Sequence, residues 1–191
     1  MKFDPSLHQR RSIRLEGYNY ASEGCYFITV VTFNRNCLFG SVVNGELLLD
    51  VPGVIACDEW QRSKEIRCEI DLGDFIVMPN HIHGIIHIVD LQNQAGSSGL
   101  RVGAYGDTPL QETMGQPFHS PSKTIGAIVR GFKSAVTKRI NLQRQTPGKP
   151  VWQRNYYEHI IRNERELLAI SNYIQTNPNR WEQDEENQPL R

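Results

Sequence analysis

The sequence lacks the features that would tie the chain to a membrane or to a secretory route. No run of apolar residues approaches the roughly 20 that a transmembrane helix needs, and the amino terminus has no signal-type pattern. The apolar and charged fractions, 39% and 22%, are those of a globular protein. We therefore expect a soluble, cytoplasmic protein without a membrane partner.

Cysteine is scarce and scattered. The four thiols belong to Cys25, Cys37, Cys57 and Cys68, and no two of them form a C-x-x-C pair. Zinc knuckles and disulfide frameworks need closely spaced or regularly patterned cysteines, so the sequence predicts neither. We interpret the four residues as structural thiols.

The chain also lacks a net charge, because 21 Lys and Arg balance 21 Asp and Glu. The distribution is nevertheless uneven, since residues 122–162 contain nine basic residues and one acid, Glu158. The nine are Lys123, Arg130, Lys133, Lys138, Arg139, Arg144, Lys149, Arg154 and Arg162. Such a segment is a candidate phosphate-binding surface, although most charge runs are simply solvated faces, and composition leaves both interpretations open.

We expect a single domain over residues 1–191, because the length only modestly exceeds the commonest domain size of roughly 100–150 residues. Three segments are not expected to build its core. Residues 1–23 are predicted to be a basic amino-terminal arm and residues 182–191 an acidic tail. Residues 91–120 are rich in Gly, Ser and Gln and have no periodicity, which predicts a mobile insertion.

Residue patterns also predict the regular elements. In the first half they are a strand at 25–33, a hairpin at 42–49 around Asn44-Gly45, a helix at 52–63, and strands at 66–71, 75–78 and 81–89. In the second half, an amphipathic helix is expected behind Ser120 as its N-cap, with its apolar face reaching residue 140. A last helix is expected from the N-cap Asn163 to Asn177, where Pro178 ends it.

Two histidines lie at the start of the strand predicted at 81–89. Because successive strand residues point to opposite faces, His81 and His83 share one face and Ile82 lies on the other. Two neutral imidazoles placed in this way can share one metal ion. By itself a His-x-His pair is more often part of a core, so the residues downstream decide. His87 has the same parity, but its Cα should lie about 13 Å from that of His83, and we expect it only to line that face.

The last helix offers a nucleophile beside a further ligand. Tyr173 flanks the apolar stripe of the helix, and Asn177 follows one turn later on the same flank. An enzyme that cuts a phosphodiester without water needs a hydroxyl that forms a covalent intermediate and a cation that polarises a non-bridging oxygen. Tyr173 could supply the hydroxyl, and His81, His83 and Asn177 could hold a hard divalent ion. A half-buried tyrosine beside a core is the alternative interpretation.

Three motifs, in this order, resemble the REP-associated tyrosine transposases, which are domesticated relatives of the single-tyrosine HUH transposases of insertion sequences. The motifs are Met-Pro-Asn-His-Ile-His-Gly at 78–84, Trp-Gln-Arg-Asn-Tyr-Tyr-Glu-His-Ile-Ile-Arg at 152–162, and Tyr173-Ile174-x-x-Asn177-Pro178. The resemblance extends from Arg11 to Trp181, and together the motifs are highly specific.

The resemblance implies an α+β fold of the ferredoxin-like type: an antiparallel β-sheet with helices packed on it and the HUH motif on a central strand. It implies that His81, His83 and Asn177 bind Mg²⁺ or Mn²⁺ and that Tyr173 attacks DNA to form a 5′-phosphotyrosine. The implied activity is that of a metal-dependent transposase, an endonuclease and strand transferase in DNA transposition and recombination. Its implied substrate is single-stranded DNA with hairpin-forming repetitive extragenic palindromes, abbreviated REP.

A DNA substrate would draw on the basic residues of the arm, the amphipathic helix and the segment after it. The expected contacts are Arg10, Arg11, Arg14, Lys123, Arg130, Lys133, Lys138, Arg139 and Arg154. We expect such a protein to associate with the nucleoid, as a monomer or a homodimer.

Two functions of other classes stay open. A metal-dependent phosphoesterase could use water with His81, His83 and His87, although the histidine triad of nucleotide hydrolases occupies positions one, three and five, where this chain has one, three and seven. A catalytically silent DNA-binding regulator could keep the fold and the basic surface without the chemistry.

Overall fold

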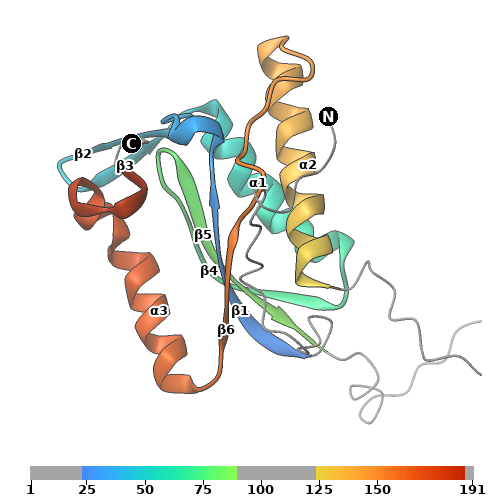
Figure 1. Cartoon of the computed structure of the whole chain (residues 1–191), viewed down its shortest axis with the longest axis vertical. Helices are drawn as coiled ribbons and strands as arrows, with labels where there is room; N and C mark the ends of the chain where they lie inside the picture. Colours follow the sequence, from blue (N-terminus) through green and yellow to red (C-terminus); the bar gives the residue numbers. More distant parts are fainter. Residues whose placement is uncertain (1–22, 90–123, 188–191) are drawn as a thin grey trace, which may run out of the picture.

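The computed structural model describes residues 23–89 and 124–187. Its centre is a four-stranded sheet with the order β4-β5-β1-β6 (Figure 1). The strands are β1 (Gly24–Val31), β4 (Ile70–Val77), β5 (His81–Ile88) and β6 (Tyr157–Ile161). All neighbouring strands are antiparallel, so β1 and β5 are central and β4 and β6 are edges.

Three helices cover this sheet, two on one face and one on the other (Figure 1). They are α1 (Val51–Ile66), α2 (Ile125–Arg144) and α3 (Glu164–Thr176). The face under α1 and α2 carries the main apolar core, where Ile82 of β5 and Trp60 of α1 are buried. A smaller cluster on the α3 face is formed by Phe27, Ile85, Ile161 and Ile174.

The connections define the topology. The units β1-α1-β4 and β5-α2-β6 each join two strands that have one other strand between them, and the two units interleave. Interleaved β-α-β units with both helices on one face form the ferredoxin-like fold. The prediction of an α+β fold with an antiparallel sheet, and with the paired histidines on a central strand, is therefore confirmed.

The helices begin where side chains can satisfy their free N–H groups. The side chain of Asn163 accepts a hydrogen bond from the N–H of Glu166, which confirms Asn163 as the N-cap of α3. The helix ends at Thr176, with Asn177 as its C-cap directly before Pro178. For α2 the cap is Thr124, whose side chain accepts from the N–H of Ala127. The predicted cap Ser120 lies outside the described residues, and the described helix begins four residues later than expected.

Two local predictions on strands have different outcomes. The hairpin of β2 (Gly40–Val43) and β3 (Glu46–Leu49) is confirmed. Its turn residues Asn44 and Gly45 have positive φ angles of 54° and 79°. Positive φ at both central residues gives a two-residue turn the twist that the flanking strands need. The two strands expected at 66–71 and 75–78 are instead the single strand β4. Gly73 does not end it, because the chain absorbs the glycine in an irregularity between Leu72 and Phe75 and then resumes pairing with β5.

Three short 3₁₀ segments complete the described chain: η1 (Phe33–Arg35), η4 (Asn177–Gln183) and η5 (Glu185–Asn187). The predicted basic arm, apart from residue 23, and the predicted insertion at 91–120 lie outside the described residues. Within the described ranges, none of the helices combines the length and apolar character that crossing a membrane requires.

Candidate metal and tyrosine site

His81 and His83 emerge on the face of the sheet that α3 covers. Both are almost completely buried, with 0% and 3% of their surface exposed, while Ile82 between them points into the opposite core. Their Nε2 atoms lie 3.0 Å apart. The alternation expected of a strand therefore brings two ligand atoms to one point.

The hydrogen bonds on the other side of each ring orient these nitrogens. The Asn80 amide donates to the backbone oxygens of Glu186, at 2.7 Å, and Arg35, at 3.3 Å, which leaves its Oδ1 to accept from Nδ1–H of His81 at 2.8 Å. Nδ1 of His83 lies 2.9 Å from the hydroxyl of Thr29. A proton on Nδ1 leaves the lone pair on Nε2, so the Asn80 contact prepares His81 to bind a cation.

Both imidazoles are neutral at physiological pH. Burial is the main reason that the pKa of His81 falls to about 3, and the Arg35 guanidinium lowers it further. Burial and then the neighbouring His81 likewise lower the pKa of His83 to about 3, which Asp184 partly opposes. Neutral imidazole is the form that binds metals.

Asp184 adds a carboxylate to this pair. Its Oδ2 lies 4.0 Å from Nε2 of His81, and one ligand atom each from His81, His83 and Asp184 fall within 4.8 Å of one another. Sequence reasoning missed this residue, because it assigned residues 182–191 to a solvated acidic tail. The available signal was Trp181, since a large aromatic residue at the start of an acidic run indicates that packing continues; its ring lies 6.1 Å from that of His81.

Asn177 lies beside this group. Its side chain is 1% exposed, and its Nδ2 donates to Oδ2 of Asp184 at 3.1 Å. The amide oxygen is buried without a hydrogen-bond partner among the described residues. A buried acceptor left unpaired is costly, so an oxygen in this position is a natural ligand for a cation. The predicted ligand Asn177 thus borders the three-residue group, joined to it through Asp184.

The donor set fits a divalent ion. Two ligands about 2.1 Å from an octahedral ion, in neighbouring positions, lie about 3.0 Å apart, which is the separation of the two Nε2 atoms. Two imidazole nitrogens with one or two oxygens also suit hard or borderline divalent metals. The group His81, His83 and Asp184 could therefore hold one, with the oxygen of Asn177 as a further donor.

Tyr173 brings its phenol to the same point. Its oxygen lies 3.2 Å from Nε2 of His83, and the side chain is 37% exposed, so one part touches the site and another meets solvent. Phe27 of β1 supports both rings, stacked on His83 at 5.3 Å and edge-on to Tyr173 at 6.2 Å between centroids. His87 lies at the other end of β5, where Nε2 is 4.0 Å from the thiol of Cys25.

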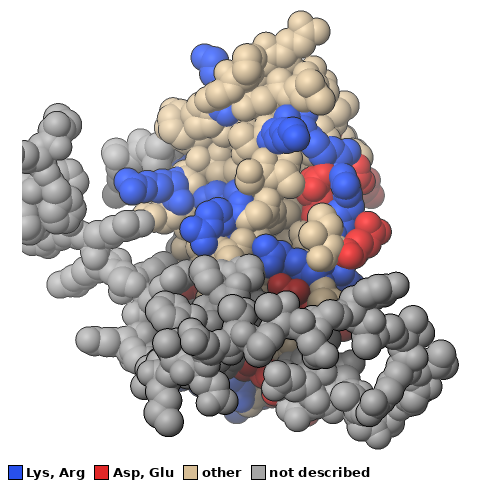
Figure 2. Space-filling model, turned by 90° about the vertical axis from the view of Figure 1, so that its right-hand side faces the viewer, with Lys and Arg blue, Asp and Glu red and all other residues tan. Residues whose placement is uncertain are grey.

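The basic residues predicted for DNA differ in their surroundings. Arg130, Lys138 and Arg154 are exposed, and Figure 2 shows Lys and Arg side chains spread over the α2 side of the molecule, with acids grouped near one edge. Arg139 instead pairs with Glu59 and Asp58 of α1, at 2.8 and 3.1 Å. Those acids already neutralise its charge.

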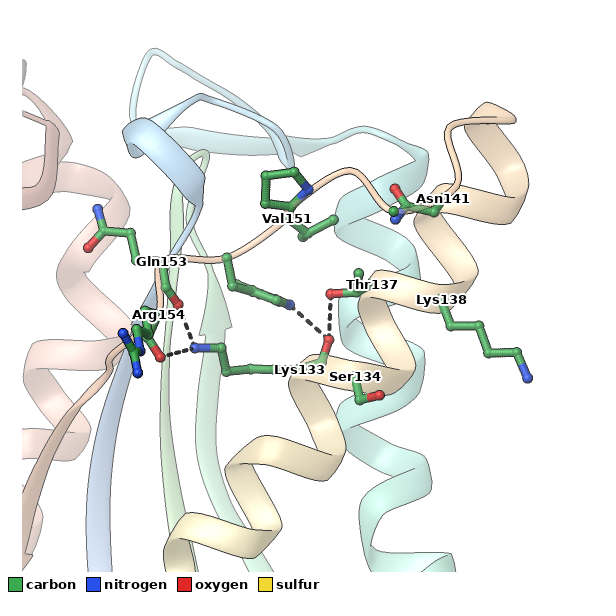
Figure 3. Close-up of a pocket in the computed structure, with 11 residues that line it drawn as sticks. Lys133, Ser134, Thr137, Lys138, Asn141, Val151, Gln153 and Arg154 are labelled. Atoms are coloured by element: carbon green, nitrogen blue, oxygen red, sulfur yellow. Dashed lines mark hydrogen bonds between the residues drawn. The ribbon is translucent and has the colours of Figure 1, made fainter. Parts of the chain in front are cut away.

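Lys133 is likewise engaged inside the protein. It borders a pocket between α2 and residues 148–154, and its ammonium donates to the backbone oxygens of Gln153 at 2.6 Å and Arg154 at 3.3 Å (Figure 3). It also donates to the backbone oxygen of Asn155, at 3.4 Å. Burial lowers the pKa of Lys133 to about 8. The remaining predicted contacts Arg10, Arg11, Arg14 and Lys123 lie outside the described residues.

Comparison with known proteins relates this geometry to others. No protein-family model matches the sequence. A protein of Haemophilus influenzae, described only as uncharacterized, is 43% identical over 185 residues, which is 96% of each chain. Among solved structures, that of a REP-associated tyrosine transposase bound to a REP hairpin superimposes with a TM-score of 0.55 and 20% identity, over 90% of this chain and 74% of the other. The chain thus belongs to one family with the Haemophilus influenzae protein, and its fold is that of the REP-associated tyrosine transposase.

Proposed function

We propose that the protein is a transposase-like nuclease that cleaves single-stranded DNA through a covalent bond to Tyr173, at or near hairpin-forming palindromes. The observation that carries the proposal is the meeting of a partly exposed phenol with two buried neutral imidazoles, Tyr173 Oη lying 3.2 Å from Nε2 of His83. A nucleophilic tyrosine needs a neighbouring base or cation, because a phenol with a pKa near 10 is mostly protonated at neutral pH.

The reaction follows from the groups present. The oxygen of Tyr173 attacks the phosphorus, and the new P–O bond joins the tyrosine to the 5′ phosphate of the downstream fragment. The 3′ oxygen of the upstream fragment leaves with the electrons of the broken bond and takes up a proton. The phenol proton passes to a base or to solvent. A divalent ion, Mg²⁺ or Mn²⁺, would polarise a non-bridging phosphate oxygen. His81 and His83, with Asp184 and Asn177 at hand, would hold it.

The phosphotyrosine keeps the bond energy of the phosphodiester, so the same intermediate permits strand transfer to another 3′ hydroxyl. A hydrolase that used water directly would have no need of Tyr173 beside the histidines. The hairpin substrate is suggested by the REP hairpin bound to the structural neighbour. The exposed cations Arg130, Lys138 and Arg154 suit a phosphate backbone.

The test is a search for the covalent adduct. Wild-type protein, incubated with Mn²⁺ and a single-stranded oligonucleotide that contains a hairpin, should form a protein–DNA adduct that survives denaturation. Tyr173→Phe should bind the DNA and yield no adduct, whereas Tyr156→Phe and Tyr157→Phe should still form one. Mass spectrometry of the adduct peptide identifies the residue, and a nucleotide on Tyr156 or Tyr157 would contradict the assignment.

The same experiment distinguishes the two alternatives. A phosphoesterase that uses water would cut without any adduct, and Tyr173→Phe would retain cleavage. A silent DNA-binding regulator would bind the hairpin and leave it intact in both Mg²⁺ and Mn²⁺.

Light scattering of the free and DNA-bound protein would separate a monomer from a homodimer.

A further inference from the structure

We propose that Tyr157 is a stacking surface for an unpaired nucleobase next to the bond that is cut. The inference rests on the proposed function, since it concerns how the same site holds its single-stranded substrate. The ligand is a purine or pyrimidine base, which the tyrosine ring would recognise by its flat face.

The position of Tyr157 in the sheet is the first observation. Tyr157 pairs with Thr29 of β1, and Thr29 pairs with His83 of β5, so the three residues form one row across three strands. Directly paired residues of antiparallel strands present their side chains to the same face. Tyr157 therefore shares the face of the candidate metal site, two strands or about 10 Å from His83.

The exposure of the ring is the second observation. Tyr157 is 50% exposed, although it lies beside Phe27, which is 8% exposed and packs on both His83 and Tyr173. The rings of Phe27 and Tyr157 meet at 6.3 Å with an interplanar angle of 68°. An edge-to-face contact covers at most one face of the phenol, so the second face is available. No hydrogen bond from its hydroxyl to a described residue holds the ring in a core.

Hydrogen bonds hold the chain on either side of Tyr157, which is the third observation. The ammonium of Lys133 binds three successive backbone oxygens at 153–155, immediately ahead of β6. The first two of these bonds are drawn in Figure 3. On the opposite face of β6, the hydroxyl of Tyr156 donates to the carboxylate of Glu158 at 2.5 Å. Stacking residues bind best when the protein has already ordered them, because little entropy remains to be lost.

Proteins that bind single-stranded DNA use exposed aromatic rings for base stacking and nearby cations for the phosphates. Tyr157 offers such a ring beside the candidate metal and tyrosine site. Base–aromatic stacking tolerates any sequence because every base has a π-face. The exposed Arg154 precedes the strand and can neutralise a phosphate of the same segment. A strand that passes along β6 would thus place one base on Tyr157 while the phosphate beside it reaches Tyr173.

The experiment uses the full chain in EDTA, so that no cleavage occurs, and a hairpin oligonucleotide with single-stranded flanks. The fluorescent adenine analogue 2-aminopurine replaces each flank position in turn. Wild-type protein should quench the emission strongly at one position next to the cleaved bond. Tyr157→Ala should lose that quenching and bind about 5- to 100-fold more weakly, whereas Tyr157→Phe should retain both because it keeps the ring. Leu168→Ala, which truncates an exposed apolar residue of α3 outside this row, should change neither.

The outcomes separate the two claims. If wild-type protein does not bind the hairpin, the proposed function and this inference both fail. If it binds and forms the Tyr173 adduct in Mn²⁺, but Tyr157→Ala keeps its affinity and its quenched position, only the stacking inference is overturned. Equal circular dichroism spectra and melting temperatures for the variants would exclude a folding defect as the cause.

Discussion

At the scale of single residues, Asn80 connects two parts of the site that are far apart in sequence. Its oxygen orients His81, and its amide hydrogens bind the backbone of Arg35 and of Glu186. Glu186 in turn pairs with Arg35 at 3.2 Å and donates its backbone N–H to Asp184 at 2.7 Å. One amide therefore influences both the lone pair of the histidine and the placement of the carboxylate.

Removing either imidazole should abolish metal binding, because each supplies one of two ligand atoms that lie 3.0 Å apart. We expect Mn²⁺ to raise the melting temperature of the wild-type protein and to leave those of His81→Ala and His83→Ala unchanged, with cleavage lost in both. Asn80→Ala keeps the ligands and should weaken Mn²⁺ binding by about 10- to 100-fold, the usual effect of losing a partner that orients a ligand.

Asp184→Asn and Asn177→Ala then identify the oxygen ligand. If Asp184 binds the ion, Asp184→Asn should weaken Mn²⁺ binding far more than Asn177→Ala does. The reverse order would assign the third ligand to Asn177. A wild-type response to Mn²⁺ in His81→Ala or His83→Ala would mean that the metal site is misassigned.

At the scale of elements, the two faces of β5 carry different kinds of residue. On the α3 side it presents the histidines, and on the other side Gly84 lets the indole of Trp60 approach the strand. A Cβ built on Gly84 would lie 2.5 Å from Cη2 of Trp60 and 3.1 Å from Phe75, whose ring stacks on the indole at 4.3 Å. The glycine of the His-Ile-His-Gly run is thus explained by packing.

Gly84→Ala should destabilise the protein, because the added methyl group meets rigid aromatic carbons that have no room to move. We expect the free energy of unfolding, measured by urea denaturation, to fall by about 1–3 kcal/mol or more. The matched control is Gly131→Ala in α2, where the new Cβ would meet Nη2 of Arg67 at 3.4 Å, an ordinary contact. That change should raise stability by about 0.5–1 kcal/mol, because alanine favours a helix over glycine. An unchanged stability for Gly84→Ala would contradict the packing argument.

At the scale of the whole molecule, the candidate site and much of the basic surface lie on opposite sides of the sheet. The helix α3 covers one face of the sheet, and α1 and α2 cover the other (Figure 1). His83 contacts Tyr173 of α3, whereas Arg130 and Lys138 belong to α2. The edge strand β6, with Arg154 ahead of it, lies between them. A DNA molecule that contacts both would pass around the sheet, and β6 is the edge that has an exposed arginine directly ahead of it. The zero net charge of the chain gives no hint of such a path.

DNA affinity should therefore depend on salt through particular cations. Each phosphate neutralised contributes about −0.7 to the log–log slope on single strands and about −0.9 on duplex. The double variant Arg130→Ala/Lys138→Ala should make the slope shallower by about 1.4–1.8 and weaken binding to all sequences alike. Lys64→Ala, which removes a lysine bound to Asp71 at 2.6 Å, is the control and should leave the slope unchanged. A flat salt dependence of the wild-type protein would instead indicate a small-molecule substrate.

Features that depend on neighbours along the chain could be predicted from the residues alone. The alternation at 81–83, the turn at Asn44-Gly45 and the cap at Asn163 follow from backbone geometry within a few residues, and the structure confirms all three. The interleaved topology was implied by motif resemblance and was confirmed as well. The roles proposed for Tyr173 and Asn177 stay predictions, although the fold brings both beside the histidines.

Features that depend on contacts between distant parts of the sequence became visible only in the folded chain. Asp184 reaches His81 because the segment after α3 returns to the start of β5. Trp181 indicates that packing continues there, but no local pattern distinguishes Asp184 from the other acids of its run. Lys133 and Arg139 look like Lys138 in the sequence, yet three carbonyls bind the first and two acids the second. A charge pattern shows on which side of a helix a basic residue lies. The groups that this residue contacts depend on the element that packs against the helix.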